Sequence, residues 1–398
     1  MNIKKISTLV ACGILVATLV YIAADRKIVA LVFGATNQQA AVTLSKNETQ
    51  NVVSWLKKLQ YTNSRQNSFG AITVSDGVAV YEDGTERPLR RVIPYFSHLA
   101  VLGVLDSGTY GSVTVAERWI HWYAHNRNTN AGVPLDTWYS ADGAYSTTCP
   151  VARDERQCNT IDAEDSSAAL FFVVIDKYIA AGGSKTFIRN NKSAIRGTQD
   201  TLLALIDADG VSWAKKTYPI KYLMDNVEVL AGLEAAVRIE TQIFKDIARA
   251  QQLSARVVIL RDTLHGGGIG SFYSTSTGQY AIYKDGAGTQ GISNMKTWYP
   301  DIMAQLWPTV FNQGSNIKSY VNAVNALKSQ LPPQTLEKGD CITLKNITGD
   351  AHAPVIAYAL RKASAVGADA LTKCMYNNMK PTYAWPVTAA DAGWLLRR

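Results

Sequence analysis

The chain has 398 residues, of which 47% are hydrophobic and 18% are charged, and its formal net charge is +8. This composition is that of a folded globular protein, and it excludes a disordered chain or one with many membrane spans. The basic residues occur as scattered pairs such as Lys57-Lys58 and Lys215-Lys216. Because nucleic-acid binding requires a clustered basic patch, we expect no nucleic-acid partner.

The first 24 residues have the pattern of an export signal. Met1 to Lys5 carries positive charge, and Ile6 to Ala24 has no formal charge. We therefore expect residues 1–24 to be either a cleaved signal peptide or an uncleaved membrane anchor. Residues 25–47 are expected to be a linker and residues 48–398 a single domain. The protein would then be periplasmic, extracellular or anchored in a membrane and facing outward.

After residue 48, apolar positions recur at helical spacing, and strand-like alternation is scarce. The chain is therefore predicted to be all-α, with several helices ending at glycine. Two segments have β-hairpin patterns, namely residues 71–81 and residues 270–283, the second with a turn at 274–278. The predicted helices span residues 48–60, 90–105, 112–127, 162–181, 185–207, 220–238, 240–263, 299–312, 315–330, 352–364 and 367–379.

Short and long connections alternate between these helices, which favours an α/α toroid, an (α/α)6 ring of helical hairpins with small β-hairpins in its loops. The long connections would gather on one face, and long loops in a compact domain are usually functional. They comprise residues 61–89, 128–161, 208–219, 264–298 and 331–351.

Four cysteines follow Cys12, an even number that indicates two disulfides in an exported protein. They allow three pairings. We favour the nearest-neighbour pairing, Cys149 with Cys158 and Cys341 with Cys374, because the first would close a short loop just before Asp162.

Three acids lie where an irregular loop becomes a long apolar helix, namely Asp162, Glu164 and Asp165. Asp162 and Asp165 share a helix face if the helix begins at or before Asp162. A helix N-terminus attracts carboxylates, so one or two of these acids could simply cap the helix. The surplus over what capping needs predicts contact with a substrate.

Acids also open two later helices. Asp225 and Glu228 are three apart at the head of an apolar helix, close after Tyr222. Asp301 follows the aromatic run Trp298-Tyr299-Pro300. In each case a helix cap is the alternative interpretation.

Carboxylates at helix mouths beside tryptophan and tyrosine indicate a sugar cleft, because aromatic rings stack on the apolar faces of pyranoses. The candidate catalytic residues are Asp162, Asp165, Asp225, Glu228 and Asp301. The candidate substrate-binding residues are Trp138, Tyr139, Asp142, Glu164, Tyr222, Trp298 and Tyr299.

Several segments together resemble a bacterial branch of the six-hairpin glycosidase superfamily. They are residues 92–100 (VIPYFSHLA), the Asp162 to Phe172 run, residues 222–233 (YLMDNVEVLAGL) and residues 298–308. The likeness spans roughly residues 48–380. It implies a toroid whose cleft lies where the inner helices begin, but glycosidases, polysaccharide lyases and terpenoid cyclases share this fold, so the fold alone does not fix the reaction.

No cofactor or metal is expected. His121 and His125 have helical spacing but lack the glutamate of a metalloprotease helix, and Gly266 to Gly270 lacks the strand and helix of a phosphate loop. The sequence therefore predicts a glycoside hydrolase that acts on a polysaccharide or oligosaccharide through paired carboxylates. A polysaccharide lyase and a noncatalytic glycan-binding protein of the cell envelope are the alternatives.

Overall fold

The computed structural model describes residues 44–77, 79–80, 86–87, 89–144, 160–313, 317–349, 352–362, 365–380 and 387–398. The predicted signal peptide or anchor, most of the predicted linker, and the predicted Cys149–Cys158 pair lie outside these residues. None of the described helices is long and apolar enough to cross a membrane.

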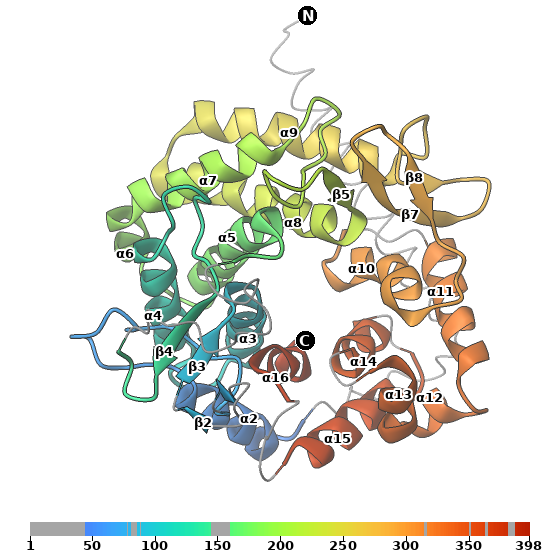
Figure 1. The fold of residues 1–398 in the computed structure, drawn as a ribbon, viewed down its shortest axis with the longest axis horizontal. Helices are drawn as coiled ribbons and strands as arrows, with labels where there is room; N and C mark the ends of the chain where they lie inside the picture. The colour runs from blue at the N-terminus through green and yellow to red at the C-terminus, as the bar shows by residue number, and fades with distance from the viewer. Residues whose placement is uncertain are drawn as a thin grey trace, which may run out of the picture.

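Six helices of the described chain form a closed inner ring, in which each packs against the next and the last returns to the first (Figure 1). These inner helices are buried around most of their circumference, which explains why their sequences are apolar on more than one face. They are α3 (Pro94–Ser107), α5 (Glu164–Ala180), α8 (Leu223–Ile239), α10 (Met303–Val310), α14 (Ala353–Lys362) and α16 (Ala389–Leu396).

A second set of helices surrounds this ring, and each precedes an inner helix in the chain. The outer helices are α2 (Lys46–Lys58), α4 (Ser112–His125), α7 (Lys192–Leu205), α9 (Ile247–His265), α11 (Ile317–Gln330) and α15 (Ala368–Met379). Shorter helical segments lie between them, namely α6 (Lys185–Asn190), η2 (Glu240–Phe244), η3 (Trp298–Ile302), α12 (Thr335–Lys338) and α13 (Cys341–Thr348). The all-α toroid predicted from the sequence is thus confirmed.

Small residues let the inner helices approach closely. A Cβ atom added to Gly103 of α3 would lie 2.2 Å from the carbonyl oxygen of Gly393 in α16. A Cβ atom added to Gly232 of α8 would lie 2.6 Å from the Cα atom of Ala169 in α5. Larger side chains at either glycine would push the two helices apart and open the ring.

The long connections all run from an outer helix to the following inner helix, whereas the connections from inner to outer helices are short. In a ring of such hairpins the inner helices run parallel, so their N-termini and the long loops share one face. The sequence prediction that the long loops gather on one face is confirmed. This face positions the candidate site.

The strands form small antiparallel sheets within these loops. β1 (Ala79–Val80) pairs with β2 (Glu86–Arg87), and β3 (Leu89–Val92) pairs with β4 (Thr137–Ser140). The third sheet contains β5 (Ile220–Tyr222), β6 (Tyr273–Ser274), β7 (Gln279–Asp285) and β8 (Gln290–Ile292), with β5, β6 and β8 all paired to β7. The β6–β7 hairpin is the one predicted over residues 270–283.

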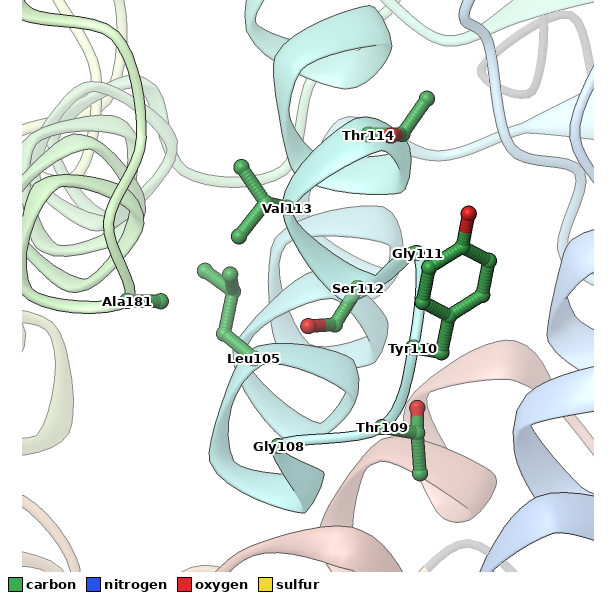
Figure 2. A pocket seen from close by; sticks show the side chains of 9 residues that line it. All are labelled: Leu105, Gly108, Thr109, Tyr110, Gly111, Ser112, Val113, Thr114 and Ala181. Carbon is green, nitrogen blue, oxygen red and sulfur yellow. The ribbon is translucent and has the colours of Figure 1, made fainter.

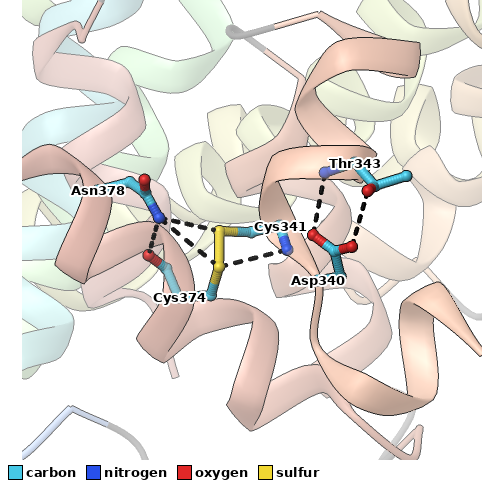
Figure 3. Close-up of a disulfide and its surroundings, with 5 residues drawn as sticks. All are labelled: Asp340, Cys341, Thr343, Cys374 and Asn378. Carbon is cyan, nitrogen blue, oxygen red and sulfur yellow. Dashed lines mark hydrogen bonds between the residues drawn. A yellow bond between two sulfur atoms is a disulfide. The ribbon is translucent and has the colours of Figure 1, made fainter.

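A disulfide joins Cys341, at the start of α13, to Cys374 in α15, as predicted (Figure 3). The two Cα atoms are 5.7 Å apart, within the range of ordinary disulfides. Asn378 donates its side-chain amide to the carbonyl oxygen of Cys374 at 2.8 Å. The disulfide thereby fixes the short helix α13 to the outer layer.

Some predicted element bounds were wrong. Residues 90–92 and 220–222 were predicted as helix but form strands, because β4 and β7 supply partners that are distant in sequence. The predicted helix over 185–207 is divided at Asn191, and the predicted loop over 331–351 contains α12 and α13. Helix α16 was not predicted, although it closes the ring.

Candidate active site

Side chains from several inner helices meet at the face where those helices begin. Tyr95 of α3 donates its hydroxyl to Oε1 of Glu228 in α8 at 2.7 Å, and Trp307 of α10 donates its indole N–H to the same oxygen at 3.2 Å. Asp165 of α5 lies near enough to Glu228 for the two charges to interact. The site is therefore built by tertiary contacts among four inner helices.

The backbone, not a side chain, caps α5. The N–H groups of Glu164 and Asp165 both point to the carbonyl oxygen of Ala214, at 2.7 and 3.4 Å. Neither α5 nor α8 has a side-chain cap at its N-cap residue, which is Ala163 in α5 and Tyr222 in α8. The alternative interpretation of Asp162 and Asp225 as helix caps is therefore wrong, and both carboxyls are left for another role.

Asp165 is fully buried in a polar network that links α5 to α8. Its Oδ1 accepts the N–H of Ser166 at 2.7 Å, and its Oδ2 is 2.6 Å from the hydroxyl oxygen of Ser212. That hydroxyl also lies 3.0 Å from Oδ1 of Asn226, yet it has a single proton to donate. All contacts are satisfied when Asp165 is protonated and donates to Ser212. Burial first, and the charge of Glu228 in addition, raise the pKa of Asp165 to about 8.

Glu228 is 1% exposed, and its two oxygens are in different situations. Oε1 accepts from Tyr95 and Trp307, whereas Oε2 is buried without a hydrogen-bond partner among the described residues. Burial raises the pKa of Glu228 to about 7, and the hydrogen bonds from Tyr95 and Trp307, together with the nearby hydroxyl of Ser166, oppose that rise. A buried carboxyl with one free oxygen can hold a proton at neutral pH.

Asp225 lies half-buried at the opening, and Asp162 is exposed. Burial raises the pKa of Asp225 well above its usual value, and the charges of Asp165, Glu228 and Asp162 raise it further. The hydroxyl of Ser166 lowers the pKa values of both Asp225 and Glu228, so this hydroxyl lies near the two carboxyl groups. No salt bridge of the described residues involves any of the four acids. Within the described part of the chain the cluster is thus acidic and without a basic partner, and its two outer members are accessible.

Two aromatic groups flank this opening. Tyr299 is 55% exposed, and its ring stacks on the imidazole of His352 with centroids 5.3 Å apart and planes 9° apart. Burial raises the pKa of Tyr299, with further contributions from the charges of Asp225, Asp162 and Glu228. Tyr222, at the start of α8, also has a pKa raised by burial and by its neighbours, Asp225 and Tyr299 among them. Both tyrosines are therefore neutral and present rings beside the acids.

The structure does not bring the other predicted site residues into this cluster. Both carboxylate oxygens of Asp301 are occupied in its own loop, where they accept from the N–H of Asn294 and the hydroxyl of Thr297. Tyr139 is 1% exposed and accepts a hydrogen bond from Trp122 in the core. The ring of Trp298 is buried.

The remaining predicted residues lie in the surrounding loops. Glu164 is buried and accepts the N–H of Lys216 at 3.2 Å. Asp142 is exposed in a turn after β4, where its side chain accepts the N–H of Ala144. Trp138 is half-buried on β4, opposite Arg91 of β3.

Sequence reasoning missed several members of the site. Tyr95, Ser212 and His352 are separated from the acids in sequence, and the apolar surroundings of Trp307 are typical of a core residue. Asp136 was also missed: its pKa is raised to about 6 by burial, although Arg91 opposes the rise, and the charge of Asp162 contributes. The Pro94-Tyr95-Phe96 run at a helix start was the one available signal for Tyr95.

The described residues contain no group of three or more histidine, cysteine, aspartate or glutamate side chains arranged to hold a metal ion. A cavity of about 490 Å³ lies at the opposite end of α3, around the turn from Gly108 to Gly111 (Figure 2). Its lining includes Tyr110 and Ala181 but no carboxylate or histidine. That cavity therefore lacks the groups of a hydrolytic site.

A closed ring of parallel inner helices, with acids and aromatic rings at the face where they begin, defines the class of α/α toroids built from helical hairpins. Solved structures of similar fold are glycosidases. One is described as a novel alpha-amylase from Clostridium perfringens, with a TM-score of 0.53 and 10% identity over 88% of this chain and 96% of that one.

Another similar structure is a glycosidase variant with a TM-score of 0.55 and 11% identity, and a third is a glycosidase variant in complex with glucose, with a TM-score of 0.54 and 12% identity. Both likenesses cover 88% of this chain and 95% of the other. The sequence matches no protein-family model and no curated protein. The resemblance to the six-hairpin glycosidases is thus confirmed at the level of the fold.

Proposed function

We propose that this protein is an exported glycoside hydrolase that cleaves a polysaccharide or oligosaccharide with the carboxyl groups at the mouths of α5 and α8. The observation that carries the proposal is the acid cluster: Asp165, Asp225 and Glu228 are gathered beside exposed Asp162, and none of the four forms an ion pair with another described residue. The predicted export signal and the Cys341–Cys374 disulfide, a bond typical of oxidising compartments, support export.

Hydrolysis of a glycosidic bond needs one protonated acid and one ionised carboxylate. Asp225 suits the acid, because it is accessible and because burial and its acidic neighbours raise its pKa well above the usual value, which favours the protonated form. It would transfer its proton to the departing glycosidic oxygen. Asp162 suits the carboxylate, because it is exposed on the same opening. It would either accept a proton from the attacking water or attack the anomeric carbon itself.

The buried acids then act as positioning residues. Asp165 and Glu228 are 0% and 1% exposed, so a sugar does not reach them without a rearrangement. Their role is to surround Asp225 with carboxyl groups and to restrain α5 and α8 through Ser212, Tyr95 and Trp307. Tyr299 would offer its exposed face to a pyranose ring at the opening.

The same electrostatics argue against the lyase alternative. A lyase would need a tyrosine or histidine base and a cation to neutralise a uronate carboxylate. Tyr95, Tyr222 and Tyr299 all have raised pKa values, because of burial and of the nearby acids. An anionic sugar would also be repelled by the exposed carboxylate of Asp162.

The test compares Asp225→Asn and Asp162→Asn with wild-type protein on soluble starch, mixed-linkage β-glucan, chitosan and polygalacturonate. Release of reducing ends measures hydrolysis, and absorbance of an unsaturated uronate measures lyase activity. We expect hydrolysis by the wild type, and a loss of about a thousandfold in Asp225→Asn. Asp200→Asn, an exposed acid on outer helix α7, is the matched control with full activity expected. Wild-type turnover in Asp225→Asn would refute the assignment.

A further inference from the structure

We propose that Tyr218, Tyr222 and Tyr283 form a second sugar-binding surface, the tyrosine platform, which holds an uncharged polysaccharide chain beyond the bond that is cut. Tyr222 and Tyr283 lie on the sheet formed by β5, β7 and β8, at the rim of the ring, and Tyr218 lies just before β5 (Figure 1). This inference rests on the proposed function, because it extends the same cleft and names the class of substrate.

Sheet register places the rings together. Tyr222 of β5 is paired directly with Tyr283 of β7, so both side chains lie on the same face of the sheet. Their ring centroids are 6.4 Å apart at an interplanar angle of 70°. The ring of Tyr218 lies 6.5 Å from that of Tyr222 at an angle of 26°, and their hydroxyl oxygens are 3.3 Å apart. Three rings thus form one continuous group.

The platform is exposed and held in place. Tyr218 is 43% exposed and Tyr283 is 36% exposed, although large aromatic side chains are usually more buried. The ring of Tyr283 lies against the backbone of Gly291 in β8, since a Cβ atom on Gly291 would be 2.2 Å from Cε1 of that ring. Ring contacts and the hydroxyl contact restrain the tyrosines before a ligand arrives, which lowers the entropy lost on binding.

The platform is continuous with the acids. Tyr222 belongs to it and is also the residue immediately before α8, three positions before Asp225. The pKa of Tyr222 is raised by burial, by Tyr218, and by Asp225 and Tyr299, so these groups are neighbours. A chain bound with one sugar at Asp225 could continue directly onto Tyr222, Tyr218 and Tyr283.

The chemistry of this surface selects an uncharged chain. Tyrosine rings bind the C–H faces of pyranoses, and their hydroxyls bond to sugar hydroxyls. Lys215 lies near Tyr218, with its ammonium 5.9 Å from the ring centroid, but it donates to the carbonyl oxygen of Ile161. At the catalytic end of the cleft the exposed carboxylate of Asp162 would repel a polyuronate.

Affinity electrophoresis tests the platform without requiring turnover. Wild type, Tyr218→Ala, Tyr283→Ala and the double variant are run through gels that contain soluble starch, mixed-linkage β-glucan or xylan, with a polygalacturonate gel as the anionic comparison. Tyr110→Ala, which removes a 96% exposed tyrosine at the other end of α3, is the matched control. We expect at least one neutral polysaccharide to retard wild type and Tyr110→Ala, and the double variant to bind about tenfold more weakly.

Two results would overturn the platform: a wild type that no neutral polysaccharide retards, or a double variant that is retarded as strongly as wild type. Gly291→Ala is a second variant, because it displaces the Tyr283 ring while keeping every tyrosine; it should weaken retardation about threefold. If the double variant were retarded less than wild type in the polygalacturonate gel but equally in the neutral gels, the preference for an uncharged chain would be refuted.

Chain-length kinetics separates this inference from the proposed function. On oligosaccharides of the hydrolysed polysaccharide, the double variant should lose about tenfold in kcat/KM on a hexasaccharide and less than twofold on a trisaccharide. Equal losses at both lengths would contradict an extended platform. If wild type binds in the gels but releases no reducing ends, the platform stands and the hydrolase assignment fails.

Discussion

Two groups of carboxylates, each built around a fully buried member, differ in the presence of counter-charges among the described residues. Glu240, at the junction of α8 and η2, is fully buried and receives Nη2 of Arg196 at 2.6 Å and Nε of Arg196 at 3.2 Å. Arg196 also pairs with Asp246, and Arg249 lies 3.8 Å from Glu240. Asp165, Asp225 and Glu228, at the other end of α5 and α8, have hydroxyl, indole and amide partners but no base among the residues that the structure describes.

The comparison shows that burial of an acid does not by itself indicate function. The arginines around Glu240 neutralise it, so its contacts stabilise the outer layer. At the N-termini of α5 and α8 no described base neutralises the acids, and burial together with their mutual repulsion raises their pKa values, as is common at functional sites. Unfavourable electrostatics are maintained there because the rigid inner helices and the close contact of Gly232 with Ala169 prevent the acids from separating.

The largest contrast is expected from Asp225→Asn. This change should reduce kcat by about a thousandfold while leaving the free energy of unfolding at pH 8 unchanged or higher, because it removes an acid that the native state holds under repulsion. Steady-state kinetics and urea unfolding measure the two effects. A variant that is less stable than wild type would contradict the view that this acid is electrostatically strained.

The opposite outcome is expected from Glu240→Gln. It leaves Arg196 without its buried partner and should lower the free energy of unfolding by about 3 kcal/mol, with turnover unchanged below the melting temperature. Glu234→Gln is the matched control, since its pair with Arg261 is exposed and should contribute less than about 1 kcal/mol. Chemical denaturation measures the free energy of unfolding of both variants. Equal losses of stability would show that the buried ion pair of Glu240 contributes no more than the exposed pair of Glu234.

Stability should also fall as pH rises. The pKa of Glu228 is about 7 in the folded protein, chiefly because of burial, against 4.5 for an ordinary glutamate. The folded state therefore binds more protons between these pH values, and the free energy of unfolding decreases as pH rises from about 4.5 to 7. Asp165, with a pKa of about 8, extends the decrease. Urea unfolding at pH 5, 6 and 7.5 measures this effect. Over that range the free energy of unfolding of Glu228→Gln should decrease by about 2 kcal/mol less than that of wild type. The same pH dependence in both proteins would disprove the raised pKa of Glu228.

The smallest effect is expected from Tyr95→Phe, which removes one of two donors to Oε1 of Glu228. We expect kcat to fall about tenfold with little change in KM, because the lost hydrogen bond disturbs the position of Glu228. The lost bond also favours the ionised form of Glu228, so its removal leaves less negative charge beside Asp225, and the alkaline limb of the pH profile should move to lower pH. Tyr376→Phe removes the hydroxyl of a buried tyrosine in α15 and serves as the control. An unshifted pH profile would show that Tyr95 is merely structural.

Much of the fold was predictable because local pattern governed it. Apolar spacing and glycine stops located most helices, and the length of the loops indicated the functional face. The errors fall at residues 90–92 and 220–222, where pairing with β4 and β7 outweighed a helical pattern. Helix α16 was missed because it is short, and its burial between α3 and α14 supplies the stability that its sequence lacks.

The site was predictable only in part. Asp162, Asp165, Asp225 and Glu228 could be found because acids next to apolar helix starts are conspicuous in sequence. Asp301 looks the same in sequence, yet the N–H of Asn294 and the hydroxyl of Thr297 occupy its carboxylate. The buried ion pair of Glu240 was not predicted, because nothing in its local sequence indicates one.

The amino-acid sequence by itself determined that the chain is a helical toroid and that acids stand at the start of its inner helices, because hydrophobic spacing and helix starts are local properties. Only the tertiary structure decided which of those acids are neutralised, which are hydrogen-bonded in their own loops, and which repel one another at an open mouth. Electrostatic energy depends on distance in space, and residues such as Tyr95, Ser212 and Trp307 reach the acids only after the ring has closed.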